Sequence, residues 1–266
     1  MSLSNLPAAV AADAAGLVAE GPAAHALWRR AYAGDRNQPS RVVVEGYVDA
    51  LVSAGDLAEA RQVLAAALQR TPRGQRRSLL ERWIVLGRMA GDLSEVEARL
   101  AQWADPDAAV LLAGLQSERG DEDAAMATLR QAWRQDTGHR GVQAALMKQL
   151  VRAGERAELA QLVAAVVRMS PRDPMPWLTL LDADVAARDH AAVRQRTDEL
   201  AQRFGRHVAL LEALIDRAQR IGDSPDRIAA LYGKLLAAAQ GAPEQAQAYA
   251  EWLLDQGRVE IGRAHV

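Results

Sequence analysis

The stretch Tyr47–Pro72, YVDALVSAGDLAEARQVLAAALQRTP, decides the fold, because the rest of the chain repeats its plan. Its first part predicts a helix that ends at Gly55, since glycine takes the left-handed conformation beyond a helix end without steric cost. The spacing i, i+3, i+4, i+7 places four apolar residues on one face of this helix. They are Val44, Tyr47, Val48 and Leu51.

A second helix is predicted directly after the glycine. Asp56 is expected to cap it, and Glu59, three residues further on, completes the pattern of a capping box. Pro72 ends this helix. The stretch therefore predicts two antiparallel helices joined by a tight turn, a unit of about 34 residues. The apolar stripe of the second helix consists of Ala60, Val63, Leu64, Ala67 and Leu68.

The same turn recurs along the chain with spacings of 34, 36, 29, 34, 34, 34 and 35, obtained by subtracting neighbouring positions. This regular interval predicts an array of helical hairpins. Arg188 replaces glycine at one turn, and a left-handed residue other than glycine costs on the order of 1 kcal/mol, so we expect that turn to differ. The aligned turn residues are Gly21, Gly55, Gly91, Gly120, Gly154, Arg188, Gly222 and Gly257.

We predict three segments. Residues 1–40 form a weak N-terminal repeat or cap, residues 41–259 form the repeat array, and residues 260–266 are a non-native tail. The ending Ile261–Val266, IGRAHV, resembles the translation of a sequencing-adapter read. The last hairpin lacks its second helix after Gly257, so the final hairpin is incomplete and we expect a fragment of a longer bacterial protein.

Composition narrows the class of protein. Half of the residues are apolar and 4% are aromatic, which favours close-packed helices over a sheet core. The net charge of −2 argues against a broad affinity for nucleic acid. The chain has no cysteine, which excludes disulfides and thiolate metal sites but leaves both cytosol and periplasm open.

The beginning of the chain lacks the basic region and the long apolar core of a signal peptide. No apolar run approaches the roughly 18 residues of a membrane span, so we expect no direct membrane insertion. The expected location is the cytoplasm, or the periplasm if Met1 is not the true start.

Two patterns have a chemical interpretation and a more ordinary one. Asp182-Ala183-Asp184 spells the D-x-D of metal-nucleotide sites in some glycosyltransferases, but it lies inside a predicted helix, where residues i and i+2 do not share a face. Ordinary helix polarity is therefore favoured. The basic loop Arg73–Arg77 could touch an acidic partner, and a solvated loop is favoured. Packing is likewise favoured over a binding platform for four tryptophans on inter-helix faces, Trp83, Trp103, Trp133 and Trp177.

Motifs for catalysis are absent. The sequence contains no G-x-S-x-G, no G-x-x-x-x-G-K-[ST] and no G-x-G-x-x-G. We expect no catalytic residue, no cofactor and no metal, and a protein that is not an enzyme. The histidines, which lack a partner at metal-ligand spacing, are His25, His139, His190, His207 and His265.

The pattern resembles tetratricopeptide repeats over almost the whole chain. In that family large residues, a glycine, alanines and a proline recur at fixed offsets. The resemblance implies an all-α fold, a right-handed α-solenoid of about seven antiparallel helical hairpins in which each hairpin buries its apolar face on its neighbours. Related helical repeats are the alternative. The matching residues are Tyr47, Gly55, Ala60, Leu64, Ala67 and Pro72, and Pro171, Trp177, Leu180 and Leu181.

In that family, the first helices of the hairpins line a concave groove that binds extended peptides or partner helices. Carried over by offset from the turn, the resemblance implies a protein-binding groove whose acidic and basic members alternate, with Lys148 and Arg152 as a basic middle. The carboxylate clamp for chaperone tails is not expected, because the only asparagines are Asn5 and Asn37. The implied groove residues are Glu45, Asp49, Glu81, Arg88, Glu118, Lys148, Arg152, Asp182, Glu212 and Asp216.

Two functions remain open at this point. The first is a non-catalytic scaffold that binds a protein or peptide, with no nucleic-acid partner. The second is the repeat arm of a larger protein whose catalytic domain, a glycosyl- or sulfo-transferase, or outer-membrane polysaccharide-export domain is missing from this chain. The sequence identifies neither the partner nor the oligomeric state.

Overall fold

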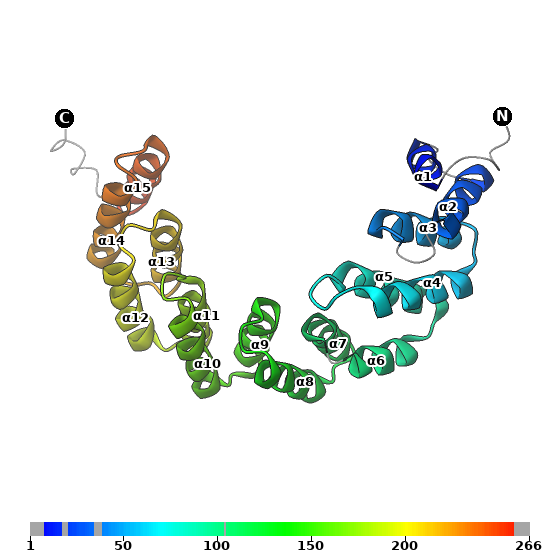
Figure 1. Cartoon of the computed structure of the whole chain (residues 1–266). Helices are drawn as coiled ribbons and strands as arrows, with labels where there is room; N and C mark the ends of the chain where they lie inside the picture. The colour runs from blue at the N-terminus through cyan, green and yellow to red at the C-terminus, as the bar shows by residue number, and fades with distance from the viewer. Residues whose placement is uncertain (1–7, 18–20, 35–38, 104, 258–266) are drawn as a thin grey trace. The chain divides into compact units, whose positions relative to one another are not determined.

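A computed structural model describes residues 8–17, 21–34, 39–103 and 105–257. These residues are helical throughout, with turns between the helices and no strand (Figure 1). The predicted non-native tail lies outside the described residues. In chain order the helices are α1 (Ala8–Leu17), α2 (Pro22–Gly34), α3 (Arg41–Ser53), α4 (Leu57–Arg70), α5 (Arg77–Ala90), α6 (Leu93–Gln102), α7 (Pro106–Glu118), α8 (Glu122–Gln135), α9 (Arg140–Ala153), α10 (Arg156–Met169), α11 (Met175–Ala186), α12 (His190–Arg203), α13 (Val208–Arg220), α14 (Pro225–Ala238) and α15 (Pro243–Asp255).

The chain divides into two compact units, Met1–Val142 and Gln143–Val266. In the first unit, α3 packs on α4, α4 on α5, α5 on α6, α6 on α7 and α7 on α8. In the second unit, packing runs in the same way from α10 through α15. Within each unit these helices thus contact the next one along the chain, which is the arrangement of an α-solenoid and confirms the predicted fold class.

The apolar faces predicted from the opening stretch are buried. On α3, Tyr47, Val48 and Leu51 are each at most 2% exposed, and on α4, Ala60 and Leu64 are fully buried. These side chains join one core that runs from α3 to α7. Helical periodicity alone therefore located the contact face of both helices, because residues i, i+3 and i+4 share one side of a helix.

The turn between α3 and α4 closes with two hydrogen bonds. Gly55 is left-handed, with φ +80°. Its N–H donates to the Val52 carbonyl oxygen at 3.0 Å, and the N–H of Asp56 donates to the Leu51 carbonyl oxygen at 2.9 Å. This is the hydrogen-bond pair of a Schellman motif, which satisfies carbonyl groups left over at the helix end. The same pair of bonds closes the turns at Gly91, Gly120, Gly154 and Gly222.

The turn at Arg188 does not differ from the others, so that expectation is wrong. Arg188 is left-handed, with φ +55°. Its N–H donates to Val185 and the N–H of Asp189 donates to Asp184, each at 3.0 Å. The two hydrogen bonds and the packing of α11 on α12 hold the backbone in the shared geometry, and the arginine bears the steric cost.

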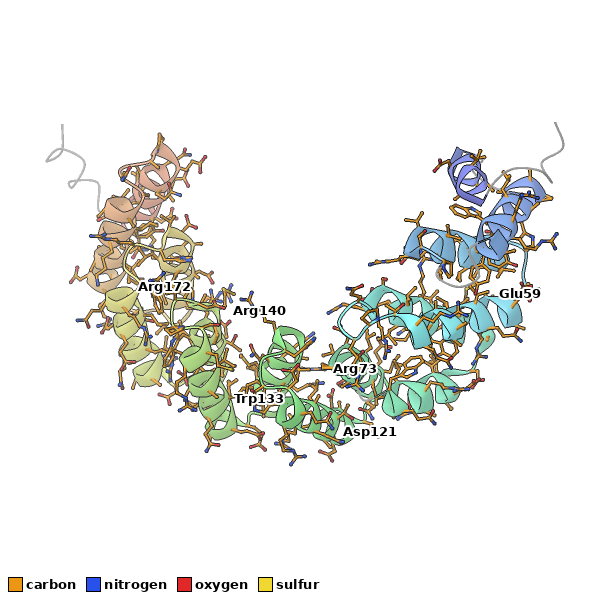
Figure 2. All side chains as sticks on the ribbon, in the orientation of Figure 1. Glu59, Arg73, Asp121, Trp133, Arg140 and Arg172 are labelled. Atoms are coloured by element: carbon orange, nitrogen blue, oxygen red, sulfur yellow. The ribbon has the colours of Figure 1, made fainter. Side chains whose placement is uncertain are left out.

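Only one of the two hydrogen bonds of the predicted capping box forms. The Asp56 carboxylate accepts the N–H of Glu59 at 3.1 Å, as predicted. Glu59, on α4 (Figure 2), does not reach back, because the Asp56 N–H already bonds to Leu51 in the turn. The Glu59 carboxylate instead accepts the hydroxyl of Tyr47 at 2.6 Å. Burial and this bond to a carboxylate together raise the pKa of Tyr47.

Aromatic side chains fill gaps between the helices of each unit. In the first unit, the rings of Trp83 and Trp103 meet edge to face with centroids 6.0 Å apart. In the second unit, Tyr232 stacks on Tyr249 at 4.9 Å beside the core of α11 to α15. The predicted packing role is confirmed for Trp83, Trp103 and Trp177, each of which lies in or against a core, and Trp133 is half-buried.

The first two helices pack through small residues. Ala11 and Ala15 of α1 and Ala31 of α2 are at most 2% exposed. They form a separate small cluster that also includes Val43 of α3. The helices therefore form a hairpin that continues onto the first full repeat. The boundary at residue 40 stays a prediction.

Close packing of α5 on α6 depends on a glycine inside a helix. A Cβ atom at Gly87 would lie 2.1 Å from the Cγ2 atom of Val96, which is fully buried. Real Cβ atoms do not approach another carbon so closely, and a buried β-branched side chain has little freedom to turn away. Gly114, in α7, has open space at the same atom. The two glycines therefore form a matched pair.

We expect Gly87→Ala to lower the free energy of unfolding by about 1–3 kcal/mol, because it overpacks the α5–α6 contact. Gly114→Ala should raise it by up to about 1 kcal/mol, since alanine is the better helix former. Urea unfolding followed by circular dichroism measures both. In a Val96→Ala background the Gly87→Ala cost should disappear. A cost that persists there would mean that the contact with Val96 is not its cause.

We expect Arg188→Gly to raise the free energy of unfolding by on the order of 1 kcal/mol, because glycine relieves the left-handed strain. The matched reverse change is Gly154→Arg, at a turn where a Cβ atom would meet no other atom within 4 Å. It should lower the free energy of unfolding by a similar amount. If urea unfolding shows changes of opposite sign in the free energy of unfolding for the two variants, left-handed strain at Arg188 is supported. An unchanged midpoint for Arg188→Gly would refute it.

Candidate protein-binding surface

All ten residues implied for the groove lie on the first helices of hairpins. In the first unit these helices are α3, α5 and α7, and in the second unit α11 and α13, with α9 spanning the boundary. That these residues bind a partner stays a prediction. By helix they are Glu45 and Asp49 on α3, Glu81 and Arg88 on α5, Glu118 on α7, Lys148 and Arg152 on α9, Asp182 on α11, and Glu212 and Asp216 on α13.

In the first unit these charged residues pair with neighbouring first helices. Asp49 of α3 forms an ion pair with Arg82 of α5, and Arg88 of α5 forms one with Glu118 of α7. Glu45 accepts a hydrogen bond from Ser78 of α5 at 3.1 Å. The alternation of sign seen in the sequence therefore corresponds to a ladder of contacts between adjacent repeats.

These ion pairs are exposed. The side chains of Asp49, Arg88 and Glu118 retain 60%, 50% and 62% of their accessible surface. Pairs in such a setting contribute roughly 0–1 kcal/mol each, because water competes for both groups. Their main consequence is that this face of the first unit carries little uncompensated charge.

Two apolar side chains lie in this charged face, and they are not among the residues that the sequence pattern implied for the groove. Val85 and Met89 of α5 are 54% and 53% exposed and lie one helical turn apart. Val85 precedes its turn glycine by six residues, as Asp49 precedes Gly55, so the same offset would have found it. At that offset α7 has Gly114, where an added Cβ atom would meet no atom within 4 Å.

In the second unit the first helices are linked in the same way. Arg217 of α13 holds Asp182 of α11 with two hydrogen bonds, at 2.8 Å and 3.1 Å. Gln245 of α15 donates to Glu212 of α13 at 3.1 Å, and Asp216 pairs with Arg220 on its own helix. These carboxylates are thus engaged by neighbours rather than presented singly to solvent.

The basic pair on α9 is exposed. Lys148 and Arg152 lie one turn apart on the solvent side of the helix. Within the described part of the chain, Lys148 has no ion-pair partner. The geometry is compatible with the predicted basic middle, which stays a prediction.

The two aspartates of the D-x-D pattern face different elements. Asp184 is 1% exposed and accepts hydrogen bonds from Arg156 of α10 at 2.6 Å and Arg196 of α12 at 2.8 Å. Asp182 turns instead to Arg217 of α13. The carboxylates therefore act as separate partners for arginines. Across the described residues no three potential metal ligands gather at one point.

Asp223 is a second buried aspartate of the second unit that is held by arginines. Its carboxylate is 3% exposed and accepts hydrogen bonds from the Ser224 N–H at 2.9 Å, Arg194 at 2.9 Å and Arg227 at 3.0 Å. Burial alone would raise its pKa, but these three bonds outweigh burial and hold the pKa of Asp223 below its ordinary value. Asp223 therefore ties the start of α14 to α12.

A hollow of about 550 Å³ lies in the first unit at the loops between its hairpins. The predicted basic loop contributes Arg73 and Gly74 to it, and Asp105, Asp136 and His139 also line it. Charges of both signs face this space. The loop is therefore part of a mixed polar surface rather than an isolated basic patch.

None of the described helices is both long enough and apolar enough to span a membrane.

Comparison with known proteins gives matches only among solved structures. No family model and no curated protein matches the sequence. A tetratricopeptide repeat protein from Parabacteroides merdae is 16% identical, with 81% of this chain and 86% of that chain covered and a TM-score of 0.46. The C-terminal part of a TPR repeat-containing protein from Cytophaga hutchinsonii is 12% identical, with 90% and 97% covered and a TM-score of 0.55.

The similarity to the Cytophaga hutchinsonii protein supports the assignment of the fold. At 12% identity it shows the fold alone. The helix order and the packing of successive hairpins lead to the same result. The chain has the all-α solenoid fold of tetratricopeptide repeat proteins, as the resemblance in the sequence implied.

The low pKa of Asp223 predicts a pH dependence of stability. Because the pKa is lower in the folded chain than in the unfolded chain, the stabilisation is present above about pH 4 and is lost as the pH falls through the folded value. Asp223→Asn should lower the free energy of unfolding by about 1–3 kcal/mol at pH 7. At pH 3 the difference from the wild type should be smaller. Urea unfolding at both pH values measures this.

The matched control for this prediction is Asp198→Asn. Asp198 also pairs with Arg227, but its side chain is 63% exposed. Its replacement should change stability by less than Asp223→Asn at pH 7. Equal effects of the two variants would mean that burial of the Asp223 carboxylate is not what matters.

Proposed function

We propose that this protein is a non-catalytic scaffold that binds a peptide or protein segment along the exposed side of its first helices. The observation that carries the proposal is the pair Val85 and Met89 on α5, both about half exposed on the face that bears the inter-repeat ladder. Large apolar side chains that share one exposed helix face favour contact with a partner.

The surroundings of this pair favour an apolar anchor rather than a highly charged ligand. The neighbouring charges are compensated, since Arg82 pairs with Asp49 and Arg88 with Glu118. The open space at Gly114 of α7 leaves room for an incoming side chain. A segment with one large apolar residue would bury Val85 and Met89, and its polar groups would meet the ladder around them.

The ten groove residues take part in this proposal as determinants of specificity. Those of the first unit set the polar frame around the apolar pair, whereas Lys148 on α9 offers an exposed positive charge. Within each unit, the order of apolar and charged residues along the surface would select the partner segment. The fold similarity to tetratricopeptide repeat proteins supports this interpretation, because a solenoid presents one extended surface made by successive repeats.

The test uses the whole chain and a random library of displayed twelve-residue peptides. Affinities of selected peptides are measured by fluorescence anisotropy for the wild type and for Val85→Asp with Met89→Asp. Burial of a valine or methionine side chain is worth about 1.5–3 kcal/mol, so the double variant should raise Kd at least about tenfold. Helicity should be unchanged, since both side chains point to solvent.

Gln62→Asp is the control, because Gln62 is exposed on α4, a second helix of a hairpin. It should leave Kd unchanged. The proposal fails if no peptide is selected, or if the selected peptides bind the double variant as tightly as the wild type.

A further inference from the structure

Two neighbouring loops of the second unit carry arginines that lie outside the first-helix surface. One loop joins α10 to α11 and the other joins α12 to α13. They lie side by side, because Arg203 at the end of α12 donates from Nη2 to the Pro171 carbonyl oxygen at 3.4 Å. Arg172, beside α11 (Figure 2), and Arg206 occupy equivalent places 34 residues apart. We call Arg172, Arg203 and Arg206 the basic loop edge.

Arg203 is held in place by its surroundings. Its guanidinium carbon lies 5.9 Å from the centre of the Trp177 ring and 5.3 Å from that of the Phe204 ring. Both distances fit a cation–π contact. Together with the hydrogen bond to Pro171, these contacts restrain the Arg203 side chain. The guanidinium group has five N–H donors, so others remain free to donate to a ligand.

The three arginines of the basic loop edge differ from the arginines that join helices of the unit, because they form no ion pair within the part of the chain that the structure describes. Arg156 of α10, for example, forms an ion pair with the buried Asp184, and Arg194 of α12 forms one with the buried Asp223. Among the described residues, no carboxylate forms an ion pair with any of the three arginines of the edge. Asp173, in the first loop, accepts the N–H of Met175 at 3.0 Å.

Two exposed methionines flank the first loop. Met169, the last residue of α10, is 47% exposed, and Met175, the first residue of α11, is 60% exposed. Methionine side chains adapt to apolar groups of different shape. The edge thus combines three positive charges with a deformable apolar border.

We propose that the basic loop edge binds an acidic peptide segment that carries an apolar residue. Arginines recognise carboxylates through paired N–H donors, and the methionines would cover the apolar residue. A single-stranded nucleic acid fits less well, because the two rings that bases could stack on, Trp177 and Phe204, are covered by Arg203. The proposal is independent of the first-helix surface and adds a second binding site.

The probe is a fluorescein-labelled peptide of glutamates around one leucine, and the same peptide with glutamine for glutamate is the reference. The full chain should bind the acidic peptide and not the reference, and affinity should fall as salt rises, since exposed charges are screened. Arg172→Glu with Arg206→Glu should weaken binding at least tenfold. The milder Arg172→Gln with Arg206→Gln should weaken it less, with unchanged helicity.

The matched control is Arg99→Glu with Arg134→Glu, which makes the same charge change at exposed positions of α6 and α8. It should leave Kd unchanged, as should the Val85→Asp, Met89→Asp variant, so this proposal and the proposed function fail separately. No binding of the acidic peptide, or equal weakening by the control, overturns the inference. Tighter binding of phosphatidylserine vesicles or single-stranded DNA, lost in Arg172→Glu with Arg206→Glu, also overturns it.

Discussion

The structure depends on one constraint, the left-handed turn that ends the first helix of each hairpin. At Gly55 the backbone reverses within a few residues, and two hydrogen bonds satisfy carbonyls at the end of α3. The next residue, Asp56, serves the following helix by accepting the N–H of Glu59. A helix end and a helix start are thus combined in three residues, which forces the two apolar faces together. Arg188 shows that the constraint is shared by the whole hairpin, because an arginine adopts the same turn at a steric cost.

Once the apolar faces are joined, the polar side chains are ordered by the interval between repeats. Asp49 and Arg82 are 33 residues apart, and Asp182 and Arg217 are 35 apart, so each pair links equivalent helices of adjacent hairpins. The charges of these pairs are compensated within the protein. Among the described residues, Lys148 and the arginines of the basic loop edge form no such ion pair. These groups are therefore the charged positions that the proposals assign to a partner.

The sequence predicted the fold well and the candidate surface in part. Helix ends and buried faces followed from local patterns, as for Tyr47, Leu51 and Leu64. The second half of the capping box was wrong, because the Asp56 N–H bonds to Leu51 and the Glu59 carboxylate accepts the hydroxyl of Tyr47, twelve residues away. The ten groove residues were selected for their charge on first helices, which overlooked Val85 and Met89. Their exposure depends on which neighbours cover α5, and a single helix does not contain that information.

By itself the sequence determined where the helices begin and end, which faces are apolar and how often the hairpin recurs. These properties depend on backbone conformation and on spacings of three or four residues, so a short stretch contains them. Only the tertiary structure decided which charges meet. Asp184 accepts hydrogen bonds from Arg156 of α10 and Arg196 of α12. Arg203 donates a hydrogen bond to Pro171 in the loop between α10 and α11. Such contacts require helices distant in sequence to be brought within hydrogen-bond distance, which packing achieves and local pattern does not encode.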